Sequence, residues 1–188
     1  MDDEAFRGRL LPGERLVWTG RPGQGVIFTG RDVFLIPFSL LWCGFAIFWT
    51  VMAATGAMAA GRAEVAWFPL FGLAFVGVGL YFVAGRFIVD AWIRRSVRYA
   101  LTDRRVLIAR AGPFADFTAV NLDRLPDARL SERRNGRGTI RFGQPAALWG
   151  GRGFSTWSPT LDPTPQFLAI EDARRVFDLV QRGTSPST

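Results

Sequence analysis

The side chains that could act as acids or bases in this chain are carboxylates, because the sequence contains no His and all 23 of its basic residues are Arg. The absence of His and Lys excludes a Ser-His-Asp triad, a Cys-His pair, a His-ligated metal and a Lys Schiff base. A single cysteine, Cys43, excludes a disulfide within the chain and is best explained as a small apolar residue. Four carboxylates remain as acid–base candidates, but their spacing matches no catalytic pattern: Asp103, Asp116, Asp123 and Asp127. We therefore expect no catalytic residue, no metal site and no cofactor.

Four arginines surround a predicted hairpin turn at Asn135-Gly136, namely Arg133, Arg134, Arg137 and Arg141. If this turn faces a membrane, each Arg adds about 1 kcal/mol of attraction to anionic lipid. The alternative is a hairpin tip in solvent, and the sequence leaves both open. Gly136 and Gly138 do not form a phosphate loop, because the helix and the Lys that such loops need are missing.

Two long uncharged runs are the main structural elements that the sequence indicates. No charged residue occurs from Val33 to Gly61 or from Val65 to Gly85. About 20 apolar residues in a helix cross a hydrocarbon core of roughly 30 Å. Soluble helices of this length carry a polar stripe, which neither run has. We therefore predict transmembrane helices over residues 33–61 and 65–86, joined by an extracytoplasmic turn at 62–64, as an antiparallel hairpin.

The arginines around these runs predict an orientation. The net charge of +7 arises after the second run, where 17 Arg face 10 acidic residues. The segment before the first run also holds Arg15, Arg21 and Arg31, whereas the turn holds only Arg62. Because short cytoplasmic flanks carry the excess of Arg, both termini are expected in the cytoplasm and the protein in the inner membrane.

Small residues recur in both runs. They are Ala53, Ala57 and Gly61 in the first run and Gly72, Gly77 and Gly79 in the second. Small residues let helix backbones approach closely in lipid. We favour packing of the hairpin on itself, and an oligomerising face is the alternative.

The rest of the chain predicts short strands followed by one helix. Residues 1–32 form a cytoplasmic juxtamembrane segment with a strand at Leu16–Thr19, expected to dock on the membrane surface or on the C-terminal domain. Residues 87–95 continue the second helix, with Asp90 and Arg94 paired on its surface. Alternating residues then predict a strand at 97–102. Further strands are expected at 106–108, 117–122, 125–132 (interrupted by Pro126), 139–142 and 154–157.

A C-terminal amphipathic helix completes the prediction. It is expected to be capped by Thr164, to begin at Pro165 and to end at Gly183, with Phe167, Ile170, Phe177 and Val180 on one face. Residues 184–188 are expected to be a disordered tail. Asp103, before the strand at 106–108, is expected to be a turn residue whose side chain bonds its own backbone.

Three strings of residues resemble the bacterial PH-domain membrane proteins. They are Leu11-Pro12-Gly13-Glu14 with its continuation to Pro22, the string from Tyr99 to Ile108 (YALTDRRVLI), and the string from Gly138 to Gly143 (GTIRFG). In that family a short N-terminal segment precedes two transmembrane helices, and a PH-like domain follows. The resemblance implies an α+β protein: a transmembrane two-helix hairpin plus a PH-like antiparallel β-barrel or sandwich at residues 87–183, capped by a C-terminal α-helix.

The resemblance does not carry phosphoinositide binding with it. PH domains that bind these lipids use Lys and Arg around their first hairpin loop. Here that loop is expected at Thr102–Arg105, which is very short and has no Lys. Arg104 and Arg105 could contact a phosphate, but a deep headgroup pocket is not expected.

These observations together predict a non-enzymatic integral membrane protein, a scaffold that holds a PH-like domain at the cytoplasmic membrane surface. The expected partners are membrane lipid and either another protein or a second copy of the chain. Nucleic acid is not expected, because the chain is tethered and has no basic helix. The alternative is a subunit of a membrane transport or channel assembly in which the Gly-rich spans are the working part.

Overall fold

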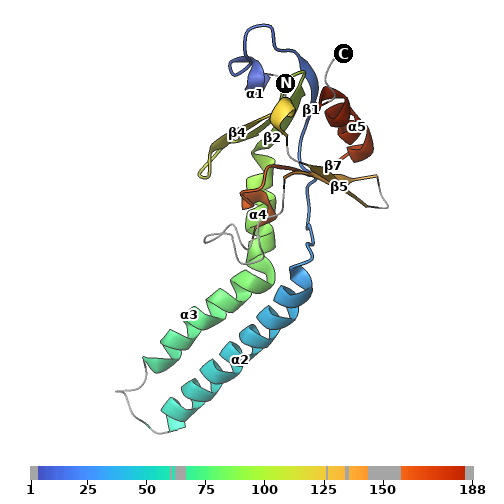
Figure 1. The fold of residues 1–188 in the computed structure, drawn as a ribbon. Helices are drawn as coiled ribbons and strands as arrows, with labels where there is room; N and C mark the ends of the chain where they lie inside the picture. Colours follow the sequence, from blue (N-terminus) through green and yellow to red (C-terminus); the bar gives the residue numbers. More distant parts are fainter. Residues whose placement is uncertain are drawn as a thin grey trace. The chain divides into compact units, whose positions relative to one another are not determined.

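The chain folds into two compact units, and one is inserted into the other along the sequence (Figure 1). The computed structural model describes residues 4–59, 61, 67–125, 127–133, 136–143 and 158–184. One unit comprises residues 1–27 and 90–188, and the other comprises residues 28–89. The chain therefore begins the first unit, leaves it to build the second, and returns to complete the first.

The inserted unit is helical. It contains α2 (Asp32–Ala59) and α3 (Phe68–Leu80), and α3 continues through a π-helical stretch, η2 (Tyr81–Gly85), into α4 (Arg86–Arg95). The start of α2 is capped by the Asp32 carboxylate, which accepts hydrogen bonds from the backbone N–H and the hydroxyl of Thr29. The structure therefore has two long apolar helices close to the predicted boundaries.

The other unit is a sandwich of two antiparallel sheets (Figure 1). The first sheet has the order β1 (Leu16–Gly20), β2 (Val97–Thr102), β3 (Arg105–Arg110) and β4 (Asp116–Asn121). The second has the order β5 (Ala128–Glu132), β6 (Gly138–Phe142) and β7 (Gln166–Ile170). The short helices α1 (Glu4–Arg7), η3 (Leu122–Arg124) and η5 (Pro159–Leu161) lie between strands or precede them, and α5 (Ala173–Thr184) follows β7. The α+β class is confirmed, as a sandwich and not a closed barrel.

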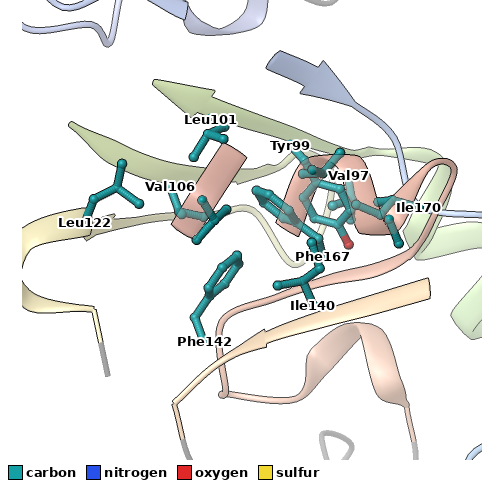
Figure 2. Packing of buried hydrophobic residues seen from close by; sticks show 12 residues of the cluster. Val97, Tyr99, Leu101, Val106, Leu122, Ile140, Phe142, Phe167 and Ile170 are labelled. Atoms are coloured by element: carbon teal, nitrogen blue, oxygen red, sulfur yellow. The ribbon is translucent and has the colours of Figure 1, made fainter. Parts of the chain in front are cut away.

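The core of the sandwich is built around Phe167, which is fully buried. Its ring lies 4.8 Å from that of Tyr99 and 5.1 Å from that of Phe142 (Figure 2). The ring of Trp18 lies 5.3 Å away. The Tyr99 hydroxyl accepts a hydrogen bond from the N–H of Leu168, which links the two sheets. Burial raises the pKa of Tyr99 above its usual value, so its phenol stays protonated.

The C-terminal helix is shorter than predicted. Residues 166–170 form β7 instead, and all five are buried. They pair with β6, while Leu168 and Ala169 pack against Ile27 on the other face. A short apolar run buried on both faces has no alternating pattern, so periodicity alone does not distinguish it from a helix. The amphipathic helix therefore begins at Ala173, with Val176 and Val180 in the core.

Three other predictions have different outcomes. The predicted hairpin is confirmed to the extent that β5 and β6 pair antiparallel, while Asn135 in its turn lies outside the described residues. The strand predicted at 154–157 lies outside the described residues, and so does the tail from residue 185 onward. Thr184, predicted as the start of that tail, is the last residue of α5.

The N-terminal segment is part of the sandwich. Strand β1 pairs with β2, with Leu16 opposite Thr102 and Gly20 opposite Tyr99. Of the two docking positions expected for this segment, the structure has the one on the C-terminal domain. The helical unit is therefore the connection between the first two strands, and the Thr102–Arg105 turn joins the second strand to the third. This turn is the first hairpin loop along the chain, as predicted, although it is the second connection between strands of the sheet.

We predict that the sandwich folds without the helical unit. In a variant with residues 28–89 replaced by a short Gly-Ser linker, all seven strands remain, and Arg94 still donates a hydrogen bond to the carbonyl of Gly25 across the joint. This variant should be water-soluble and unfold cooperatively in urea. A matched variant that also lacks residues 1–27 loses β1 and should not unfold cooperatively, because β2 is left as a bare edge. Equal stability of the two variants would contradict this account.

Candidate functional site

Among the described residues of the sandwich, Glu14 is the most densely bonded charged side chain. Its two carboxylate oxygens accept hydrogen bonds from Arg105 Nη2 at 2.6 Å and Arg105 Nε at 3.0 Å, a fork-to-fork pair. The same carboxylate accepts from the Leu11 N–H at 2.7 Å and the Thr102 hydroxyl at 2.7 Å. The Arg105 guanidinium is the main reason why the pKa of Glu14 is lowered from 4.5 to about 2, although burial opposes the shift.

This Glu14–Arg105 pair joins two of the strings that carried the family resemblance. Glu14 ends the Leu11–Glu14 string, and Arg105 lies within the string from Tyr99 to Ile108. The ion pair was not predicted from the sequence, because its two residues lie on opposite sides of the helical unit along the chain. Their presence in the two strings was the available signal.

The Thr102–Arg105 turn therefore binds the N-terminal segment through its side chains. Arg105 is bound to Glu14, and the pairing raises the pKa of Arg105. Asp103 accepts a hydrogen bond from the Arg15 N–H at 3.0 Å, which corrects the expectation that it bonds its own backbone. The backbone N–H groups of this turn instead reach the Thr102 hydroxyl, from Arg104 at 3.2 Å and from Arg105 at 2.8 Å. Arg104 is exposed.

A second charged cluster lies where β1 and β2 lead toward the helical unit. Arg94 Nε lies 3.3 Å from Asp90 Oδ2, so the predicted pair exists, but the two side chains are buried and not on the helix surface. The cause is the chain packed over this turn of α4: the Ser158 hydroxyl donates a hydrogen bond to Asp90, and Arg94 donates one to the carbonyl of Gly25. The Thr160 N–H donates to Asp90 at 3.1 Å. The segments before α2 and after η2 are thereby fixed to each other within the sandwich unit.

A third charged pair lies inside the helical unit. Arg86 Nη1 lies 2.6 Å from Asp32 Oδ1, and both side chains are buried. Arg86 Nε also donates to the carbonyl of Phe82 at 2.9 Å, and its guanidinium stacks over the Phe87 ring at 4.3 Å. Removing one partner of such a pair typically costs about 3 to 5 kcal/mol, because the other charge stays buried without compensation. The pair therefore holds the start of α2 to the start of α4.

The arginines predicted to contact anionic lipid do not share one position. Arg133 and Arg137 bracket the β5–β6 turn, with the Arg133 N–H donating to the carbonyl of Arg137 at 2.8 Å. Arg137 pairs with Glu171 at 3.0 Å. Arg141 lies four residues farther along β6, roughly 13 Å away, and donates to Gln166 at 3.2 Å. Arg134 lies outside the described residues, and lipid contact by this group stays a prediction.

The small residues of the two helices fall into two groups. A Cβ added at Gly72 would lie 2.3 Å from the hydroxyl oxygen of Thr50, and one added at Gly79 would lie 2.9 Å from the Cα of Cys43, so α2 approaches α3 closely at both. A Cβ at Gly61 or Gly77 would meet nothing within 4 Å. Ala53 is half-buried in α2. The side chain of Ala57 is not among those described.

The four carboxylates weighed for acid–base chemistry are all exposed: Asp103, Asp116, Asp123 and Asp127. Asp103 and Asp116 lie at opposite ends of β3, and Asp116 is 3.7 Å from Arg110. Within the described part of the chain, no group of three or more His, Cys, Asp or Glu residues is placed to hold a metal ion. The charged groups of the described sandwich that do converge, around Glu14 and Asp90, bind one another.

Comparison with known proteins gives one match. A family model described as "Bacterial PH domain" matches residues 33–184, which include every helix and strand from α3 to α5 and all but the first residue of α2. No curated protein and no solved structure matches the chain. The matched range begins after β1, the strand that completes the first sheet.

We predict that Glu14→Gln destabilises the full-length chain by about 3 to 4 kcal/mol at neutral pH, since a pKa shift of one unit corresponds to about 1.4 kcal/mol. The carboxylate pKa is lowered from 4.5 to about 2 in the folded state, so its contribution is complete above pH 4.5 and is lost as the pH falls toward 2. Chemical unfolding in detergent micelles at several pH values measures this difference. Glu132→Gln, at an exposed position on β5, is the matched control. A pH-independent gap between Glu14→Gln and wild type would contradict the ion-pair assignment.

Proposed function

The chain belongs to the bacterial PH domain family, and on that basis we propose that it is an integral membrane protein whose two apolar helices hold a PH-like sandwich at the cytoplasmic membrane surface. PH domains are typically non-catalytic binding modules that take lipids or proteins as partners. The proposed role is therefore binding: the sandwich contacts a protein partner, a second copy of the chain or anionic lipid. No catalytic step is assigned to it.

The observation that carries this proposal is the exposure of the apolar helices. Two helical stretches, Asp32–Gly56 and Pro69–Arg95, are long and apolar enough to cross a membrane, and each has a mean hydropathy of 1.9. Only 22% and 17% of their most apolar windows are buried, whereas the core helix of a soluble protein is mostly buried. Large side chains face outward along both helices, with Leu41 74% exposed and Leu70 65% exposed. Such a surface is stable in hydrocarbon and not in water.

The internal polar groups of these helices also suit a bilayer. The hydroxyls of Thr50 and Thr55 donate to carbonyls of their own helix, Ala46 at 2.7 Å and Val51 at 3.0 Å. A hydroxyl in hydrocarbon must be satisfied internally, because no water competes for it. The close approach of α2 and α3 at Gly72 and Gly79 supports a hairpin that packs on itself.

The flanking arginines support an inner-membrane protein with both termini in the cytoplasm. Arg21 and Arg31 precede the first helix, and the exposed Arg95 ends the second. Because an excess of Arg near helix ends stays on the cytoplasmic side, the turn at 62–64 is proposed to be extracytoplasmic.

We predict that the full-length chain stays in the membrane pellet after alkaline carbonate extraction. A reporter that is active only in the cytoplasm should be active when fused after Thr188 and inactive when inserted at Ala63. An exported reporter should give the reverse pattern at the same two positions. Release of the chain by carbonate, or an active exported reporter after Thr188, would contradict the proposal.

A further inference from the structure

Exposed aromatic side chains gather at one end of the first sheet. Trp92 on α4 is 54% exposed and Phe114 in the β3–β4 turn is 42% exposed. Both line a groove of about 280 Å³, whose walls are the last turn of α4 and residues 111–114. Pro113 and Arg95 also line the groove. We call Trp92, Arg95, Pro113 and Phe114 the aromatic turn patch.

Backbone contacts fix the aromatic turn patch beside the end of α4. Strand register places Val97 opposite Arg110, so the turn that follows β3 begins where β2 starts. The Ala111 N–H donates to the carbonyl of Ser96 at 3.1 Å, which ties the turn to the residue after α4. Gly112 has a φ of +90°, a conformation that a residue with a side chain rarely adopts. The turn is therefore set by its backbone and not by burial of its aromatic ring.

Side-chain hydrogen bonds anchor the backbone of the same turn. Arg110 Nε donates to the carbonyl of Phe114, and Arg110 Nη1 donates to the carbonyl of Thr160 at 3.1 Å. The Phe114 backbone is thus anchored while its ring stays exposed. With Trp92 and Pro113 around the same groove, this ring belongs to a contiguous exposed apolar patch, which marks an interaction site better than a single exposed ring does.

We propose that the aromatic turn patch inserts into the lipid headgroup region, so that the sandwich contacts the bilayer through the β3–β4 turn. This inference rests on the proposed function. The helix that ends beside the patch runs from Pro69 to Arg95, 27 residues. At about 1.5 Å per residue, roughly 20 of these residues cross a 30 Å core, and the last two turns emerge from it. Trp92 then lies at headgroup level, where Trp is strongly favoured.

Charge favours lipid over a protein as the occupant of this surface. Arg95 is exposed and makes no ion pair in the described part of the chain. A positive side chain beside exposed aromatic rings suits an anionic bilayer surface, where each Arg contributes about 1 kcal/mol. A protein partner would have to compete with lipid for a surface next to the point where the helix leaves the core.

The test uses the full-length chain with Cys43→Ala, reconstituted in bilayers containing phosphatidylglycerol and carrying one nitroxide-labelled cysteine. The labelled positions are Phe114→Cys in the patch, Arg104→Cys in the exposed turn at the other end of β3, and Phe71→Cys on the exposed face of α3. Power saturation then compares collisions with oxygen, which is enriched in lipid, and with a water-soluble nickel complex. At position 114 the nickel collision rate should be severalfold lower than at position 104.

The outcomes separate this inference from the proposed function. A lipid-like signal at 71 with a water-like signal at 114 overturns the patch contact and leaves the anchoring intact. A water-like signal at 71 overturns the anchoring itself. A label at 114 that neither oxygen nor nickel reaches indicates protein contact and also overturns lipid as the occupant.

A second measurement leaves Phe114 in place. A label at Ala111→Cys, beside the patch, should lose its lipid-like signal when Trp92→Ser and Phe114→Ser are combined. An unchanged signal at position 111 would contradict a role for these two rings.

Discussion

The pairing of β1 with β2 is the interaction on which the rest of this structure depends. The two strands belong to one sheet, yet the whole helical unit separates them in sequence. Closing so long a loop costs conformational entropy that the paired strands must offset. The Glu14–Arg105 pair, the Trp18 ring against Phe167 and the hydrogen bonds between strands supply that compensation. The binding module is therefore completed only when the chain has passed through both apolar helices.

Three buried charged pairs lie at points where this topology must hold separate segments together. Glu14 with Arg105 closes the sheet, Asp90 with Arg94 fixes the chain beside β2, and Asp32 with Arg86 joins two helix starts. Buried pairs are weak evidence for net stability, because desolvation opposes their attraction. Each pair nevertheless fixes which segments meet, since it joins segments distant in sequence or anchors one that follows a long excursion of the chain. These pairs fix the segments through which the chain enters and leaves each unit.

Local patterns in the sequence predicted much of this fold, and non-local contacts account for what they missed. Alternation predicted β2, and Asn135-Gly136 predicted a hairpin with β6 as its returning strand, because these signals act over a few residues. The start of the last helix was misplaced, because Phe167 to Ile170 is an apolar run buried on both faces. The i,i+4 spacing predicted Asp90 with Arg94, but their burial depends on Ser158 and Gly25, which no spacing rule connects to α4. Phe114 was not predicted as a contact residue, because an aromatic residue in a turn is informative only once its exposure is known.

Hydrogen–deuterium exchange of the full-length chain in lipid nanodiscs tests the central claim most directly. If β1 is a strand of the sandwich, the amides of residues 16–20 that point toward β2 will exchange slowly, because the paired strands protect each other. Exchange should be fast in the exposed residues after β1, from Gln24 to Val26. Exchange of every amide in residues 16–20 at the rate of Gln24 to Val26, while residues 97–102 stay protected, would contradict the account.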